Sequence, residues 1–410
     1  MMDLKLHSKV ALVYFTLAGI LGVMLRSFHS IEIPVNYKFF VHTHSHIALL
    51  GWIYVAFTTL IYKLYIQSPL NDKKYRKIFW FTQLTLVGML VSFPLQGYAL
   101  FSIIFSTMFL FASYGFVWFF VKYSKKELKK TNSYKLIKAA LWYLVLSSLG
   151  PWALGAIMNT LGAGSIWYRM AIYFYLHFQY NGWMIMALLG LCLFVMERNQ
   201  IMQSNQNFII FFWSLNLGII LSFFLSTLFA DPPILFNILG GVGAMSQLIA
   251  LVFLLIAFVP ELQRSRTLLS PSQNRLLKTV AVLLGVKMLL QLPTSFSYFA
   301  DLATTYLDFT IGYLHWTFLG VISTGLFLLL DCFKLIRVSK MSYFLYFFGF
   351  VLTEVLIFYK AIVAWQHLKL FDGYFEVLAV VSLLIPLSLV LMLAIKRRET
   401  KPDHSSISRK

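Results

Sequence analysis

Apolar residues fill this chain in long runs that short polar segments separate. Twelve of these runs are long enough to cross a bilayer as helices. They cover residues 10–28, 42–63, 77–98, 100–121, 138–160, 168–196, 207–229, 235–259, 276–298, 309–333, 342–363 and 374–395. The pattern therefore predicts an all-α polytopic membrane protein of about 12 transmembrane helices. We expect a single transmembrane domain over residues 1–400 and a polar tail at 401–410.

The composition agrees with this fold class. Hydrophobic residues make up 60% of the chain and charged residues only 12%, which is about half the charged fraction of a typical soluble domain. A net charge of +19 can indicate nucleic-acid binding. Here the charges lie between the apolar runs rather than along one face, so we expect membrane lipid as the surroundings and no nucleic acid as a partner.

Positive charge predicts the orientation in the membrane. Lysine and arginine concentrate in every second connection and in the tail, at residues 73–77, 122–138, 264–275, 334–340 and 396–401. The alternate connections at 160–167, 230–234 and 299–308 contain neither residue. The positive-inside rule then places both termini on the cytoplasmic side of the cell's inner membrane. The first run lacks a small-residue cleavage site after it, so we expect a retained helix rather than a signal peptide.

Three histidines lie inside the outer ends of predicted helices 2, 6 and 10. His46, His177 and His315 are about four, nine and six residues in, which corresponds to roughly 6–14 Å of helix. An ionisable side chain at such a depth is a candidate for a functional site, although histidines also bond helices to one another. His7 and His404, near the two termini, are expected to be solvated.

The spacing around these three histidines repeats. Each is followed, after four intervening residues, by a glycine: Gly51, Gly182 and Gly320. The intervals between the histidines are also similar, at 131 residues from 46 to 177 and 138 residues from 177 to 315. Because each interval spans four predicted helices, we expect three four-helix units in a pseudo-threefold arrangement.

This layout suits the binding of a metal or a heme. Neutral imidazole is a common ligand of heme iron and also suits copper. Two histidines from different helices at one depth can hold a heme between them, and His42, one turn from His46, shares its face and can join the same site. His44 points the opposite way and is expected to face a loop or another helix. Cationic residues at the same outer face can hold the propionates: Arg26, Lys38 and Arg169.

Twelve helices with histidines on helices 2, 6 and 10 resemble the heme–copper oxidase subunit I and the nitric-oxide reductase large subunit. The segment 42–52, His-Thr-His-Ser-His-Ile-Ala-Leu-Leu-Gly-Trp, is similar to the second helix of that family, and also to the NnrS family of heme- and copper-containing membrane proteins. The resemblance implies that His46 and His315 hold a b-type heme and that His177 is a ligand of copper or non-heme iron. It further implies a quinol or cytochrome electron donor and other membrane subunits as partners.

The chain departs from this family at several metal ligands. The family has two further histidines on helix 7, whereas residues 207–229 contain none. It also has a His-x-His pair on helix 10, whereas Tyr313 and Thr317 stand two residues to either side of His315. We therefore expect a heme protein of electron transfer, respiration, or nitric-oxide or oxygen binding, without full oxidase activity. Whether it is an oxidoreductase is left open, and no catalytic residue is assigned.

A transporter or channel with a histidine-lined outer vestibule is the alternative. Transporters commonly have inverted repeats and a binding site at the membrane midplane. Here the histidines are off-centre, and helices 2, 6 and 10 all run inward, which favours the heme interpretation.

Other polar groups lie inside the predicted helices. Lys287 is near the middle of the ninth and Glu354 near the middle of the eleventh. Each either belongs to a proton path or is held by neighbours such as Gln291. Asn181, close to His177, either binds a polar ligand or bonds one helix to another.

Overall fold

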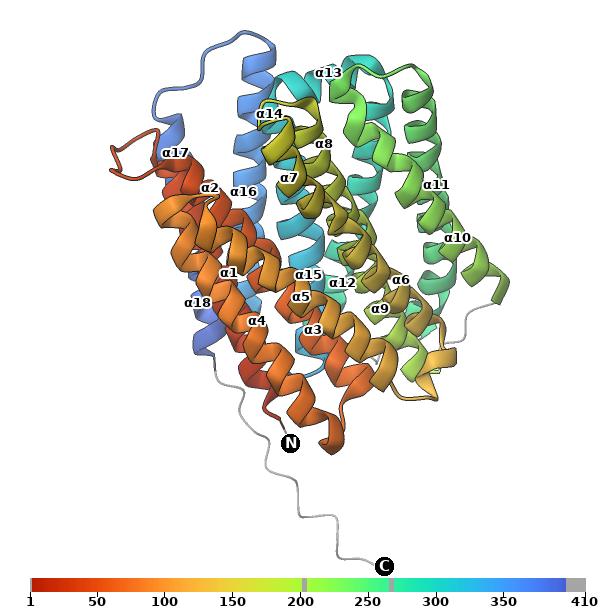
Figure 1. Ribbon diagram of the computed structural model, residues 1–410. Coiled ribbons are helices and arrows are strands. Elements are labelled where there is room, and N and C mark those ends of the chain that lie inside the picture. The colour runs from red at the N-terminus through yellow and green to blue at the C-terminus, as the bar shows by residue number, and fades with distance from the viewer. Residues whose placement is uncertain (1, 201–204, 265–268, 396–410) are drawn as a thin grey trace, which may run out of the picture.

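The computed structural model describes residues 2–200, 205–264 and 269–395, with the backbone alone for 257–264. Those residues form a bundle of helices without any strand (Figure 1). Twelve spans among them are long and apolar enough to cross a membrane. The predicted all-α polytopic membrane fold is therefore confirmed, while the polar tail and His404 lie outside the described residues.

Several of the twelve spans consist of more than one helical segment. Spans one to four are α1 (Leu4–Ser27), then α2 (Tyr37–His46) with η1 (Ile47–Tyr54), α3 (Val55–Ile61) and η2 (Tyr62–Ile66), then α4 (Pro69–Gln96) and α5 (Leu100–Tyr123). After the short η3 (Leu128–Lys130), spans five to seven are α6 (Asn132–Ser147) with α7 (Leu149–Thr160), then α8 (Ile166–His177) with η4 (Phe178–Ile185) and α9 (Met186–Arg198), then α10 (Asn205–Ser222) with η5 (Phe223–Ala230).

The remaining spans follow the same plan. Spans eight and nine are α11 (Leu235–Arg264) and α12 (Pro271–Gln291) with η6 (Pro293–Ser295), and a short helix α13 (Ser297–Thr305) follows them. Spans ten to twelve are α14 (Leu307–His315) with η7 (Trp316–Ser323) and α15 (Thr324–Cys332), then α16 (Lys340–Trp365), then α17 (Tyr374–Ser382) with α18 (Leu384–Ala394).

The helices extend beyond the apolar runs that predicted them. Helix α1 begins at Leu4 rather than near residue 10, because the Asp3 carboxylate accepts hydrogen bonds from the backbone N–H groups of Lys5 and Leu6. This early start corrects the expectation for His7. Its side chain is only 3% exposed and stacks on Phe79 with ring centroids 3.5 Å apart, so His7 is packed against α4 rather than solvated.

Spans two, six and ten form the centre of the bundle. Buried residues make up 89%, 89% and 67% of their apolar windows, against at most 44% for each of the other nine. Their inner segments α3, α9 and α15 pack against one another in all three pairs. The first and last spans are also neighbours, since α1 packs on α18. Three central helices, each four spans from the next, agree with the predicted three four-helix units.

Each central span widens into a π-helix directly after its histidine. The segments η1, η4 and η7 follow His46, His177 and His315, and each is eight residues long. π-Helices are rare and occur frequently at functional sites. The repeat detected in the sequence is therefore also a repeat of backbone conformation.

The glycine of each repeat lies inside the π-helix and under an aromatic ring. A Cβ atom on Gly51 would lie 2.8 Å from the side chain of Tyr14. The corresponding distances are 2.6 Å from Gly182 to Tyr143 and 2.7 Å from Gly320 to Phe350. All three are closer than carbon atoms approach without a bond, so the spacing of histidine and glycine reflects close packing of neighbouring spans.

Candidate functional site

His44 and His315 present the same nitrogen atom in the same way. The Nδ1–H of His44 donates to the carbonyl oxygen of Ala18 in α1 at 2.9 Å, and the Nδ1–H of His315 donates to the carbonyl oxygen of Ile311 at 2.9 Å. A carbonyl oxygen only accepts, so the proton is on Nδ1 and Nε2 keeps a lone pair. His44 thus faces another helix, as one of its predicted alternatives stated.

Neither Nε2 has a hydrogen-bond partner in the part of the chain that the structure describes. Both residues are half-buried, so each retains accessible surface. Gly22 makes room for His44 on α1, because a Cβ atom there would lie 3.1 Å from its Cε1. A histidine with Nδ1 held by a carbonyl and Nε2 free has the arrangement that metal-ligating histidines show.

One charged side chain, that of Arg26, lies within electrostatic range of His315, and His44 lies within the same range. Arg26 is also within electrostatic range of Glu354 and Asp308. Among the described residues, Nη1 of Arg26 and both carboxylate oxygens of Glu354 are buried without a hydrogen-bond partner. A buried guanidinium with an unused N–H group can bind an anionic oxygen.

Spans two and ten pack less tightly against each other near their histidines than they do further along the helices. The two spans pack closely through α3 and α15, whereas α2 and α14, which carry His44 and His315, do not pack closely. The indole Nε1–H of Trp52 donates to Ser323 Oγ at 2.8 Å and joins the two π-helices. His44 and His315 therefore lie on segments of spans two and ten that are not in close contact with each other.

His46 and His42 share one face of α2, as predicted, but that face is turned toward the end of α4. The Nδ1–H of His46 donates to the carbonyl oxygen of His42 at 2.8 Å, and Nε2 accepts from the Tyr98 hydroxyl at 3.4 Å. The His46 ring lies 4.4 Å from that of Phe93, and the His42 ring 4.6 Å from that of Tyr98. His46 is thus turned toward α4 and Tyr98, whereas His44 is turned toward α1.

His177 has both ring nitrogens in use. Its Nε2–H donates to the carbonyl oxygen of Ile219 at 2.8 Å, so Nδ1 accepts, from Asn181 Nδ2 and Ser226 Oγ at 3.3 Å each. No group of three His, Cys, Asp or Glu side chains that could hold a metal occurs within residues 2–200, 205–264 and 269–395. The metal-ligand roles of His46, His177 and His315 remain predictions, and the structure gives each of the three a separate set of neighbours.

The two arginines predicted at the heme rim lie in different places. Arg26 is on α1 beside His315. The guanidinium carbon of Arg169 lies 4.2 Å from the ring centroid of Phe229, and its Nη2–H donates to the Tyr173 hydroxyl at 3.3 Å. Arg169 is therefore held by aromatic rings of spans six and seven.

Lys287 is completely buried in α12 and is hydrogen-bonded. Its ammonium donates to Asn181 Oδ1 and, at 2.9 Å, to Gln291 Oε1. The ammonium also lies 5.7 Å and 5.9 Å from the ring centroids of Tyr180 and Tyr313. Of the two alternatives predicted for Lys287, the structure bears out stabilisation by neighbours that include Gln291. The sequence had not connected Lys287 with Asn181, which is 106 residues away.

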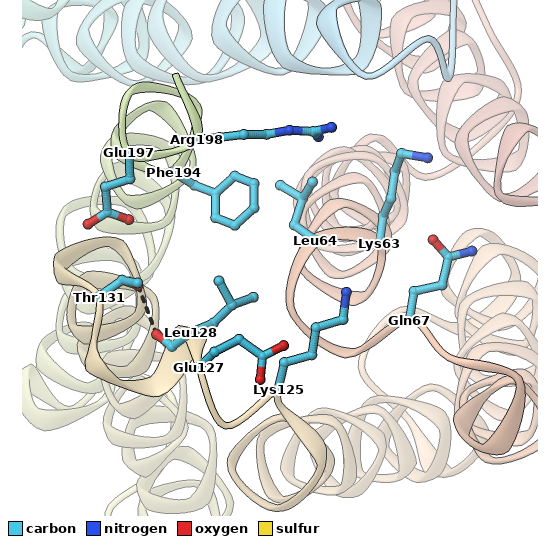
Figure 2. A pocket seen from close by; sticks show the side chains of 10 residues that line it. All are labelled: Lys63, Leu64, Gln67, Lys125, Glu127, Leu128, Thr131, Phe194, Glu197 and Arg198. Atoms are coloured by element: carbon cyan, nitrogen blue, oxygen red, sulfur yellow. Dashed lines mark hydrogen bonds between the residues drawn. The ribbon is translucent and has the colours of Figure 1, made fainter. Parts of the chain in front are cut away.

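A cleft of about 530 Å³ lies at the opposite end of the bundle from the histidines, where spans two and six end (Figure 2). The side chains of Lys63, Lys125 and Arg198 extend toward it. Glu197 turns away, because its carboxylate accepts from the backbone N–H groups that begin α6. Basic residues at the end where α1 begins agree with the predicted inner side of the membrane.

Comparison with known proteins finds no family model and no curated protein that matches the chain. The resemblance to the heme–copper oxidases accordingly remains a prediction from the residues quoted above.

Proposed function

We propose that the protein binds a b-type heme between His44 and His315 and acts in electron transfer or in the binding of nitric oxide or oxygen, in the cytoplasmic membrane of the cell. One observation carries the proposal. Two histidines, one on central span two and one on central span ten, each have an unprotonated Nε2 without a hydrogen-bond partner among the described residues, within electrostatic range of a guanidinium that has an unused N–H group.

The chemistry of His44, His315 and Arg26 is suited to holding a heme. The hydrogen bonds from Nδ1 to Ala18 and Ile311 fix both rings and make Nε2 a better donor of its lone pair. The unused Nη1–H of Arg26 is suited to donate a charge-assisted hydrogen bond to a propionate oxygen. When bound, the heme would supply one-electron transfer or a gas ligand site.

The proposal changes one ligand that the family resemblance implied. His46 is two residues after His44 and therefore on nearly the opposite face of α2. Its Nε2 already accepts a hydrogen bond from Tyr98. We assign no ligand for copper or non-heme iron, because both nitrogens of His177 are hydrogen-bonded within the protein.

The test is the reduced-minus-oxidised visible spectrum of the purified protein, expressed with ample heme. We expect the bands of a low-spin b-type heme. His44→Ala and His315→Ala should each abolish these bands or convert them to a high-spin form, because each removes one of the two side chains that would hold the heme iron. His46→Ala is the matched control, since it removes a histidine of the same helix, and its spectrum should stay low-spin.

The outcomes are separable. A protein without heme bands under these conditions would overturn the proposal. Low-spin bands that disappear in His46→Ala and persist in His44→Ala would restore the pairing of His46 with His315 and reject the ligand proposed here.

A further inference from the structure

A cavity of about 510 Å³ lies between spans six, seven, nine, ten and eleven, under α13. Most of its wall is apolar, with aromatic and aliphatic side chains such as Leu225, Phe229, Phe299, Phe358 and Trp365. Its polar residues include His177, Asn181, Ser226 and Gln291. An apolar cavity with a small number of polar groups is the usual form of a site for a small molecule.

Lys287 fixes the orientation of two of these polar side chains, the amides of Asn181 and Gln291. Its ammonium has only hydrogen atoms to offer, so Asn181 and Gln291 must turn their oxygen atoms toward it. The Gln291 oxygen also accepts from the Tyr313 hydroxyl at 3.3 Å. Both amides therefore direct their N–H groups away from the lysine.

Asn181, held in this orientation, also donates a hydrogen bond to His177. One N–H of Asn181 faces Nδ1 of His177 at 3.3 Å, which accepts because Nε2–H of the same ring is bonded to Ile219. Lys287, Asn181 and His177 thus form a series of hydrogen bonds in which each side chain has one orientation. Turning over the amide of Asn181 or the ring of His177 would break a buried hydrogen bond.

The amide nitrogen of Gln291 is the one N–H donor of these side chains for which the described residues offer no acceptor. Gln291 is only 7% exposed and lines the cavity, and its Nε2 has no hydrogen-bond partner among the described residues. A buried donor without an acceptor costs free energy. An oxygen atom of a ligand in the cavity would remove that cost.

We propose that this cavity binds a small apolar molecule that carries a carbonyl-type acceptor oxygen, which accepts a hydrogen bond from Gln291 Nε2. The apolar walls take the body of the molecule, and the amide selects for the oxygen. Lys287 is a positioning residue, because it keeps the amide nitrogen rather than the amide oxygen directed at the ligand. This inference does not depend on heme, since none of its residues is a proposed heme ligand.

A matched pair of rigid probes tests the proposal on the intact protein. 9-Fluorenone carries one carbonyl oxygen, and fluorene has the same ring system without it. Binding of each probe is measured by equilibrium dialysis of the protein in nanodiscs, with empty nanodiscs subtracted. We expect saturable binding of both, with fluorenone bound at least about tenfold more tightly, because one buried hydrogen bond is made or lost.

Three variants test which residue causes the preference for fluorenone over fluorene. Gln291→Glu replaces the donor with a second acceptor that Lys287 still pairs with, and it should abolish the preference for fluorenone. Lys287→Met frees both amides to turn and should reduce the same preference severalfold. Gln83→Leu removes another buried amide, 5% exposed in α4, and should leave the preference unchanged. Fluorene binding should be equal in all four proteins, which shows that the cavity itself is intact.

Equal affinity of the wild-type protein for the two probes would overturn the proposal, as would the absence of saturable binding of either. A preference that survives Gln291→Glu would do the same. These results are independent of the visible spectrum, so a failure here leaves the heme proposal standing, and a protein without heme can still show the preference.

Discussion

At the scale of single residues, the histidines of α2 face different neighbours: His44 is bonded to α1, whereas His46 lies against Phe93 of α4. The depth of the histidines and the polar character of Lys287 and Asn181 can be recognised from hydropathy alone. Whether His44 or His46 faces span ten depends on the rotation of α2 about its axis. That rotation is fixed by packing, such as the bond from His44 to Ala18 of α1, and no local pattern records it.

The glycines of the three repeats have a direct consequence for stability. Gly51→Ala and Gly182→Ala each place a methyl group within 3 Å of a buried tyrosine ring. We expect each to lower the free energy of unfolding by about 1–3 kcal/mol, since overpacking displaces neighbouring side chains. Titration with a denaturing detergent, followed by circular dichroism, measures this free energy.

A glycine in open space is the control for this prediction. Gly115 lies inside helix α5, and a Cβ atom added to it would have no neighbouring atom within 4 Å. Gly115→Ala should leave stability unchanged or raise it by up to about 1 kcal/mol, because alanine favours a helix. Equal losses at Gly115 and Gly51 would show that the aromatic ring is not the cause.

At the scale of elements, the apolar runs located every span but missed the internal structure of several. Hydropathy finds the apolar centre of a helix, so the starts set by capping groups were placed late, as at Asp3 of α1. The π-helices η1, η4 and η7 were not predicted, because a wider turn changes hydrogen bonding without changing hydropathy. The recurring glycine lies inside each of these π-helices, although the sequence analysis used it only as evidence for three repeated units.

The start of α6 depends on a residue from span six. The Glu197 carboxylate accepts from the backbone N–H groups of Asn132 and Ser133 at 2.8 Å and 3.0 Å. Glu197→Ala should lower the free energy of unfolding by about 0.5–2 kcal/mol, as for other lost caps. Glu127→Ala is the control, because Glu127 is exposed and lines the same cleft, and a loss of the same size there would contradict the capping role.

At the scale of the whole molecule, the charge pattern predicts which end faces the cytoplasm. The basic cleft of Lys63, Lys125 and Arg198 (Figure 2) lies at the end where α1 begins. Alkaline phosphatase inserted after Gly164, in a connection without lysine or arginine, should be active, because the enzyme needs the oxidising outer compartment. The same enzyme inserted after Lys126 should be inactive, and the reverse pattern would invert the proposed orientation.

The repeated histidines related spans two, six and ten to one another, but the sequence did not predict that these spans are central. Lipid-facing and buried helices are both apolar, so hydropathy does not separate them. A repeat shows which helices are equivalent, and equivalent helices can lie near the axis or at the rim of the bundle. What the repeat could not supply was the chemistry, which depends on contacts such as that of Lys287 with Asn181.

Because spans two and ten are neighbours at the centre but far apart in the sequence, span two is synthesised well before span ten. Span two leaves the ribosome early, yet the partner it packs against through α15 begins at Leu307, about 240 residues after Ile66. At about 5–20 residues per second, synthesis of that stretch takes on the order of 10–50 s. During that interval span two, with its three histidines, can pack against α1, α4 and α5 but lacks its contact with span ten. A membrane chaperone that shields polar helices would be needed most at this stage, before span ten arrives.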